Sequence, residues 1–355
     1  MYGPAIIHFQ DFSSHPSFSL QIGLSLPNSA SHGRSTIKSN DRKTRILVCA
    51  PSNTAVDDLA WRIHQCCIGA DGKIGHFNIV RLGNTRAEEK ITNSSLNSKY
   101  ANTWMKNTFG KEEFLHRIHI DQLMPEDTFD KRKVIMESDI VCTTVNGAGS
   151  KALIEASYRG DGSGKSSEFD VVIIDEACQA SEHATLIPLK YNPKVVVMVG
   201  DPQQLPVFSR MNAPKSKNFG RSLFQRLQLN GFPVDMLKVQ YRMHPDIAMF
   251  PSRQFYGNQL ITSNCVRSRD QALWHQHICF PPFLVWNLEQ GRMVRNVDGG
   301  TFNREEDSFI LRKILRLFSQ KFGQHPGIIS IGIISFYNEQ VRYIKKICAE
   351  VLIHV

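Results

Sequence analysis

Short apolar runs alternate with amphipathic segments along most of this 355-residue chain. Runs of four or five residues rich in Val and Ile, bounded by polar residues, Gly or Pro, predict buried β-strands. They occupy Ile46–Ala50, Ile140–Thr144, Val171–Ile174, Val195–Val199 and Ile331–Ser335. Their continuous apolarity is typical of parallel strands covered on both faces, and the helical segments between them indicate βαβ units. We therefore expect an α/β fold.

An amphipathic helix is predicted directly after the first strand, beyond the segment Pro-Ser-Asn-Thr at 51–54. Five apolar residues fall on one face at helical spacing. They are Val56, Leu59, Ala60, Ile63 and Cys67. Thr54 can cap this helix, and Asp57 with Asp58 in the first turn suit its dipole.

Two segments lack the strand and helix periodicity. Residues 1–40 are rich in serine with scattered Pro and Gly, which predicts a disordered leader. Residues 84–137 are polar and charged with weaker helical patterning, and we interpret them as a helical insertion. The insertion would lie on a first domain at 41–215, followed by a second domain at 216–355.

Composition narrows the class of protein. There are 42 Lys and Arg against 33 Asp and Glu, a net charge of +9 that favours polyanionic partners, although many soluble proteins are basic without binding nucleic acid. The eight cysteines include no C-x-x-C pair and several lie in apolar runs, which indicates a reducing compartment with neither disulfides nor a zinc site. No apolar stretch approaches the roughly 18 residues of a membrane span, and we predict no secretory signal and no membrane association.

Candidate chemistry begins where the strand Val171–Ile174 ends in Asp175 and Glu176. Two carboxylates at the carboxyl end of a parallel strand stand where α/β folds bind their ligands. There Asp175 can hold Mg²⁺ through water, and Glu176 can polarise an attacking water. A strand that merely ends in a solvated acidic turn would have the same sequence.

Two further segments carry phosphate-directed side chains. GDPQQLP, at 200–206, follows the strand Val195–Val199, and its Gln204 is able to orient a water beside a γ-phosphate. QYRMHP, at 240–245, supplies Arg242, which could stabilise the charge of a phosphoryl transition state. We interpret His244 as structural, because nothing pairs it with a nucleophile.

In their order and spacing these segments resemble the motifs of superfamily 1 helicases of the senataxin and nonsense-mediated-decay (Upf-like) group. The sequence ILVCAPSNTAVDDL is similar to motif Ia, DIVCTTVNGAG to the Ic-type segment, VVIIDEACQA to motif II, VMVGDPQQLPV to motif III and VQYRMHP to motif IV. FYGNQL, DGGTFNREE and IGIISFYNEQV resemble later segments. The resemblance runs from about Arg45 to the C-terminus, and it implies tandem RecA-like P-loop NTPase domains.

The resemblance implies an ATP-dependent, 5′-to-3′ helicase that uses ATP and Mg²⁺ and acts on single-stranded RNA or DNA, with RNA favoured. We expect a nuclear or cytoplasmic monomer. Carried over by position, Asp175 would hold Mg²⁺, Glu176 would be the catalytic base, Gln204 the γ-phosphate sensor and Arg242 a γ-phosphate arginine, with Gly200 and Asp201 also at the nucleotide. Pro51, Ser52, Asn53, Thr54, Thr144 and Val145 would contact the backbone of a single strand.

The sequence departs from the family pattern at both ends, from which we expect a chain truncated at both ends with two incomplete domains. Nothing between Met1 and Thr44 fits the G-x-x-x-x-G-K-[ST] loop that wraps phosphates, and the glycines of Gly160–Ser166 lie one residue too close. The chain stops at Val355, before motifs V and VI. Without the phosphate-loop strand a neighbouring strand should be unpaired along one edge, unless Ala5–Phe9 substitutes for it.

Three functions remain open at this point. The first is the helicase itself. The second is a catalytically inactive family member that binds single-stranded nucleic acid or partner proteins without turnover, because the lysine-bearing loop is missing. The third is a metal-dependent nuclease, which would need further acidic ligands near Asp175 and Glu176.

Overall fold

A computed structural model describes residues 5–10, 44–66, 77–83, 114–115, 118, 128–157, 169–208, 220–269, 272–297, 299–324 and 331–352. The chain forms two compact units. The first comprises Met1–Gln240 and Pro251–Ile261, and the second comprises Tyr241–Phe250 and Thr262–Val355. Among the described helices, none is both long and apolar enough to cross a membrane.

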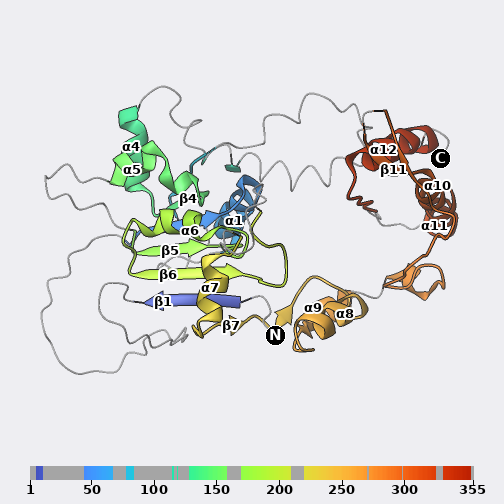
Figure 1. Ribbon diagram of the computed structural model, residues 1–355, viewed down its shortest axis with the longest axis horizontal. Coiled ribbons are helices and arrows are strands. Elements are labelled where there is room, and N and C mark those ends of the chain that lie inside the picture. Colours follow the sequence, from blue (N-terminus) through green and yellow to red (C-terminus); the bar gives the residue numbers. More distant parts are fainter. Residues whose placement is uncertain are drawn as a thin grey trace, which may run out of the picture. The chain divides into compact units, whose positions relative to one another are not determined.

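The first unit is built on a seven-stranded sheet with the order β3-β4-β2-β5-β6-β1-β7 (Figure 1). The strands are β1 (Ala5–Gln10), β2 (Ile46–Ala50), β3 (Ile79–Arg81), β4 (Ile140–Thr144), β5 (Val171–Ile174), β6 (Val195–Gly200) and β7 (Asp235–Met236). The five strands from β3 to β6 in that order run parallel. The predicted α/β fold is confirmed, and four of the predicted runs are strands; β3 is an additional strand.

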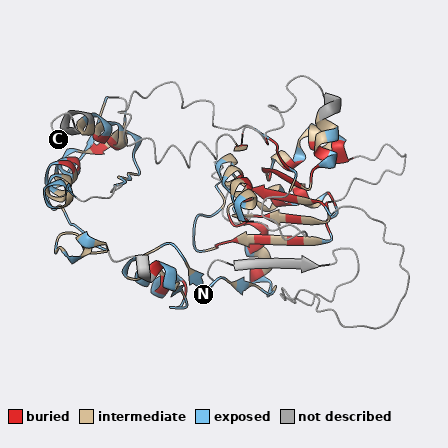
Figure 2. Cartoon of the chain, turned by 180° about the vertical axis from the view of Figure 1, so that it is seen from behind, coloured by how far each residue is buried: buried red, intermediate tan, exposed pale blue. Residues whose placement is uncertain are grey.

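Two hydrophobic clusters pack against the sheet. The buried residues of its central strands are red in Figure 2. On one face pack α4 (Thr128–Glu137), α5 (Lys151–Ser157), α6 (Glu182–Leu189) and α7 (Leu223–Leu229). On the other face α1 (Asn53–Cys66) inserts Val56 and Ala60, both 0% exposed. β2 and β4 are almost entirely buried, as predicted for strands covered on both faces. β5 and β6 instead alternate buried and half-buried residues, so their second face is less fully covered.

The strand β1 lies within the residues predicted to be a disordered leader. It pairs antiparallel with β6, with Ala5 opposite Gly200 and Gln10 opposite Val195, and β7 pairs with its other side. The expectation of an unpaired edge beside β6 is therefore wrong, and the alternative that Ala5–Phe9 substitutes as a strand is confirmed. An apolar run can take the position beside β6 because its backbone pairs with the N–H and C=O groups that β6 would otherwise expose. Residues 11–40 lie outside the described residues.

The predicted insertion at 84–137 also lies largely outside the described residues. Its last ten residues form α4, which anchors in the core through Ile135 at 0% exposure. Phe114 stacks on His64 of α1, with 4.3 Å between the ring centroids. The described parts of this segment therefore pack on both sides of the sheet, Ile135 in one hydrophobic cluster and Phe114 against the other.

The second unit is organised around a hairpin of β10 (Met293–Arg295) and β11 (Thr301–Asn303). Its helical elements include α9 (Asn264–Arg269), α10 (Arg304–Ser308), the π-helical turn η5 (Phe309–Leu315), α11 (Arg316–Phe322) and α12 (Asn338–Leu352). Asn303 caps α10 by accepting hydrogen bonds from the amides of Glu305 and Glu306 at 3.1 and 3.2 Å. The hairpin and α10 are thus joined at one capping residue.

The strand predicted at Ile331–Ser335 is wrong. These residues have no regular secondary structure, and Ile334 is 96% exposed. A parallel strand exists only through its ladder of hydrogen bonds, and no described segment pairs with this run. Its apolarity alone did not determine a strand.

Candidate active site and nucleic-acid interface

The carboxyl edge of the parallel sheet gathers four of the sequence-predicted segments. The register pairs Ala50 with Thr144 and Ile174 with Met198, so the residues that follow these strands leave the sheet at the same edge. The amide of Asp175 donates to the carbonyl of Cys49 at 2.9 Å. The amide of Val145 donates to the carbonyl of Ala50, also at 2.9 Å. Motifs Ia, Ic-type, II and III therefore meet at one edge.

Glu176 occupies a left-handed backbone conformation, with φ of 50°. The next amide, that of Ala177, donates to the carbonyl of Val199 at 2.8 Å and ties this turn to β6. Gln179 Nε2 donates to Glu176 Oε2 at 2.9 Å. Non-glycine residues keep such a conformation only where surrounding contacts hold it, and such positions concentrate at functional sites.

Gly200 leaves room for the turn that carries the two carboxylates. A Cβ at this position would lie 2.9 Å from Cys178 Sγ and 3.0 Å from the Cys178 backbone nitrogen. Gly200 was predicted to lie at a nucleotide; its contacts in the structure give it a packing role, because it lets β6 approach the turn after β5.

Asp175 is half-buried, and burial raises the pKa of its carboxyl group. A hydrogen bond from the Glu176 backbone and the positive charge of Arg62 on α1 oppose that shift. A cation bound beside Asp175 would favour its charged form in the same way. Mg²⁺ needs few protein ligands, since one or two carboxylates and substrate phosphates commonly hold it.

Within the described ranges, no group of three or more His, Cys, Asp and Glu side chains could hold a metal ion. A magnesium nucleotide site needs no such group, and Asp175 fits it as a single carboxylate. A nuclease would require additional acidic ligands, and within the described residues no third side chain joins Asp175 and Glu176 in a group that could hold a metal ion.

Asp201 is a buried hydrogen-bonding centre, 5% exposed, directly after β6. Its Oδ1 accepts from the amide of Gln203 at 2.9 Å, and its Oδ2 accepts from Gln204 Nε2 and from the hydroxyl of Tyr256, each at 2.7 Å. Burial, and secondarily the bond to Asp201, raise the pKa of Tyr256 to about 12. Asp201 thus holds the exposed Gln204 in place, and Tyr256 is a site residue that sequence reasoning missed within FYGNQL.

Motif Ia forms the start of α1. Ser52 caps this helix, since its Oγ accepts from the amide of Ala55 at 3.2 Å. The predicted cap at Thr54 is wrong: the helix begins at Asn53, and Thr54 lies exposed in its first turn. The reason is that the chain turns directly after β2, so the hydroxyl two residues earlier reaches the free amides.

Arg81 contacts this segment from behind and was also missed by sequence reasoning. It is 0% exposed, and its Nε donates to Asp57 Oδ1 at 2.8 Å while its Nη2 donates to Asn53 Oδ1 at 2.9 Å. Asp57 therefore neutralises a buried arginine, rather than acting mainly on the helix dipole as predicted. An arginine inside the apolar run Ile79–Leu82 is the sequence signal that could have indicated it.

The two residues of the Ic-type segment that were predicted to contact a single strand, Thr144 and Val145, differ in burial. Thr144 is half-buried, and its Oγ1 accepts from the amide of Gly147 at 3.0 Å. The side chain of Val145 is 2% exposed and belongs to the core. The Val145 side chain is therefore covered by the core and is not open to a nucleic-acid strand.

Arg242 belongs to the second unit, where it lies exposed in the bend before α8 (Pro245–Phe255). It is the one predicted catalytic residue outside the first unit. In the same bend His244 Nδ1 accepts from the amide of Asp246 at 3.1 Å. This local bond agrees with the structural interpretation of His244.

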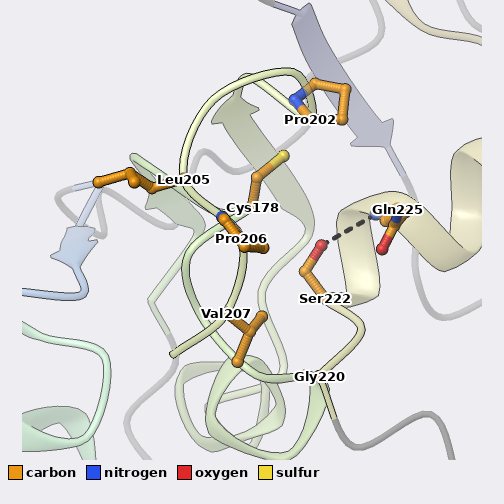
Figure 3. A pocket seen from close by; sticks show the side chains of 8 residues that line it. All are labelled: Cys178, Pro202, Leu205, Pro206, Val207, Gly220, Ser222 and Gln225. Atoms are coloured by element: carbon orange, nitrogen blue, oxygen red, sulfur yellow. Dashed lines mark hydrogen bonds between the residues drawn. The ribbon is translucent and has the colours of Figure 1, made fainter. Parts of the chain in front are cut away.

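A small pocket opens beneath the motif III loop (Figure 3). It is lined by Cys178, Pro202, Leu205, Pro206, Val207, Gly220, Ser222 and Gln225. Ser222 caps α7 by accepting from the amide of Gln225 at 3.1 Å. The pocket holds about 30 Å³ for solvent, room for one or two water molecules, so it is too small for a nucleotide.

A parallel sheet with an Asp-Glu turn at its carboxyl edge and a glutamine loop after the next strand is the arrangement of RecA-like P-loop helicase domains. Two family models described as AAA domain match the chain, one over residues 19–124 and 104–209 and the other over 219–353. The chain belongs to the superfamily 1 helicases of the senataxin and Upf-like group.

Three named relatives illustrate this membership. The chain is 35% identical over 306 residues to the probable helicase MAGATAMA 3 of Arabidopsis thaliana, covering 85% of this chain and 35% of that protein. It is 30% identical over 318 residues to the regulator of nonsense transcripts 1 homolog of Neurospora crassa, covering 85% and 26%. It is 27% identical over 370 residues to the probable helicase senataxin of Homo sapiens, covering 86% and 13%. The chain thus spans about a third or less of the length of these relatives.

Proposed function

We propose that this chain carries motor domains of an ATP-dependent nucleic-acid helicase that moves 5′-to-3′ and prefers RNA to DNA. It acts as a monomer in the nucleus or the cytoplasm. The observation that carries the proposal is the meeting of motifs Ia and II at one sheet edge, through the 2.9 Å bond from the Asp175 amide to the Cys49 carbonyl. The residues proposed for hydrolysis and those proposed to bind the single strand would then be held at the same edge of the sheet.

Four side chains would have distinct roles in hydrolysis. Asp175 would hold Mg²⁺ through water, and the metal would neutralise charge on the phosphates. Glu176, held by Gln179, would accept a proton from the attacking water. Gln204, held by Asp201, would orient that water beside the γ-phosphate, and Arg242 of the second unit would stabilise the charge that develops there.

The strand would be gripped by Pro51, Ser52, Asn53 and Thr54, together with Thr144 and Val145. Ser52 and Thr54 are exposed, and Pro51 and Asn53 are half-buried, so all four can be reached from solvent. Contacts of this kind go to phosphates and sugars and give affinity with little sequence preference.

A second candidate function is binding of single strands, or of partner proteins, without turnover. It is favoured by the direction of β1, whose Gln10 end lies beside Val195, the residue of β6 farthest from the Asp175 edge. β1 therefore runs antiparallel to β6 and ends at the edge of the sheet opposite to Asp175. The sequence between Met1 and Thr44 also contains no G-x-x-x-x-G-K-[ST] motif.

The test is single-strand-stimulated ATP hydrolysis by purified 1–355, measured beside Glu176→Gln and a matched control, Glu182→Gln. Glu182, the first residue of α6, pairs with Arg226 of α7 at 2.8 Å, and removing such a partly exposed ion pair costs about 0–1 kcal/mol. Turnover lost in Glu176→Gln and kept in Glu182→Gln supports the helicase. No turnover, with salt-sensitive RNA binding retained, supports the second candidate. Absence of both turnover and RNA binding refutes the helicase and the strand-binding form of the second candidate.

A further inference from the structure

Arg81 closes β3, the outermost strand of the parallel sheet, with its side chain turned inward under the first turn of α1. Its guanidinium donates to Asp57 Oδ1 at 2.8 Å, to Asn53 Oδ1 at 2.9 Å and to the carbonyl of Leu82. A fully buried arginine is tolerated when its donors are satisfied in this way. These three hydrogen bonds hold the guanidinium in one orientation. Because one of them goes to Asn53, they also hold the Asn53 side chain.

The bond to Asn53 determines which end of that amide faces outward. A guanidinium carries donors and no acceptor, so it can face the amide oxygen but not the amide NH₂ group. With Oδ1 held by Arg81, the two N–H donors of Nδ2 point away from the guanidinium. Asn53 is half-buried between Ser52 and Thr54, both exposed. N–H donors presented there match the acceptor oxygens of a phosphate backbone.

We propose that Arg81 is a positioning residue for the single-strand grip: it orients the Asn53 amide so that Nδ2 donates to the strand. The inference rests on the proposed function, in which residues 51–54 contact a single strand. Arg81 itself is 0% exposed and does not touch nucleic acid. It acts through Asn53.

The chain around Arg81 supports such a role. Gly83 has φ of +104°, and a Cβ there would lie 3.3 Å from Arg81 Nη1 and 3.7 Å from Asn53 Oδ1. The backbone therefore leaves the sheet close over the Arg81–Asn53 contact. The carbonyl of Leu82 also accepts from Thr143 Oγ1 at 3.2 Å. Arg81 is thus braced against β4, whose last residue is Thr144, a candidate of the second strand-contacting segment.

The test is a double-mutant cycle on the full chain, read by fluorescence anisotropy with a labelled single-stranded oligouridine. Asn53→Ala and Arg81→Lys should each weaken binding about five- to tenfold, and the double variant should bind no more weakly than the weaker single variant. Losses that multiply in the double variant would overturn the proposal, because Arg81 would then act independently of Asn53. Arg45→Lys is the matched control and should bind like the wild type. Arg45 is 6% exposed and donates to the carbonyl of Ile135 at the opposite end of β2.

A second variant keeps the proposal testable if Arg81→Lys does not fold. Asn53→Asp retains an oxygen for Arg81 and removes the outward NH₂, so it should melt no lower than the wild type and bind at least tenfold more weakly. Wild-type affinity in Asn53→Asp or Asn53→Ala would overturn the positioning role while leaving strand binding by the chain intact. Absence of binding by the wild type would instead refute the proposed function, and the positioning role with it.

Discussion

The hydroxyl of Tyr256 donates to Asp201 Oδ2 at 2.7 Å, although 55 residues separate the two along the chain. The same carboxylate oxygen accepts from Gln204 Nε2. The side chain proposed to orient the attacking water is therefore held by a buried carboxylate, and that carboxylate is held by a tyrosine from after α8. This chain of contacts makes Tyr256 a support for Gln204.

Tyr256→Phe is expected to lower the unfolding free energy by about 1.5–3 kcal/mol, since it removes a hydrogen bond to a buried charged group. If the chain hydrolyses ATP, kcat should fall as well, because Asp201 is left freer to release Gln204. Tyr191→Phe is the matched control: its hydroxyl donates to the carbonyl of Ala148 at 2.6 Å, in the core and away from the loop. Urea unfolding and steady-state kinetics of both variants check this, and an equal loss of kcat in Tyr191→Phe would contradict it.

Gly200→Ala should destabilise the first unit by about 1–3 kcal/mol, because a Cβ 2.9 Å from Cys178 Sγ overpacks a tight contact. The displaced turn carries Asp175 and Glu176, so any turnover should fall further than stability alone explains. Gly220→Ala is the control, since a Cβ there meets no atom within 4 Å. Thermal melting compares the two, and similar melting temperatures would show that the turn adapts.

Asp307 in the second unit should make stability depend on pH. It is 0% exposed and accepts from Gln340 Nε2 at 2.6 Å, and burial raises its pKa to about 6. Because the folded state holds this proton more tightly than the unfolded state does, its contribution favours folding at low pH. That contribution is lost as the pH rises from about 4 through about 6.

Asp307→Asn removes this titration while keeping the shape of the side chain. The difference in unfolding free energy between Asp307→Asn and the wild type should therefore grow in favour of the variant from pH 4 to pH 7. Chemical denaturation at several pH values measures it. A difference independent of pH would mean that Asp307 titrates as it does in the unfolded chain.

The exposed cysteine thiols should react with alkylating reagents faster than the buried ones. Burial raises the pKa of Cys142 and of Cys178 to about 12 each, and it raises that of Cys49 as well. Cys66 and Cys265 are exposed. Brief alkylation at pH 8 followed by peptide mass spectrometry should modify these two first, with the three buried thiols reacting after addition of denaturant. Early modification of Cys49 would show that β2 opens in the native state.

The amino-acid sequence by itself determined the central strands, because each is a local apolar run that only a covered parallel sheet can bury. It also indicated Asp175, Glu176 and Gln204, since polar residues at or shortly after the end of a buried parallel strand emerge at the carboxyl edge of the sheet. The same local logic failed for Ile331–Ser335, where no described neighbour supplies the ladder.

The tertiary structure alone decided the contacts that hold the site in place. Arg81 meets Asn53 across 28 residues and Tyr256 meets Asp201 across 55, and no local pattern encodes which distant partner a polar side chain finds. The pairing of β1 with β6 is of the same kind. Hydrophobic periodicity reports what each segment must bury, whereas hydrogen-bond partners depend on how distant segments are brought together when the sheet forms.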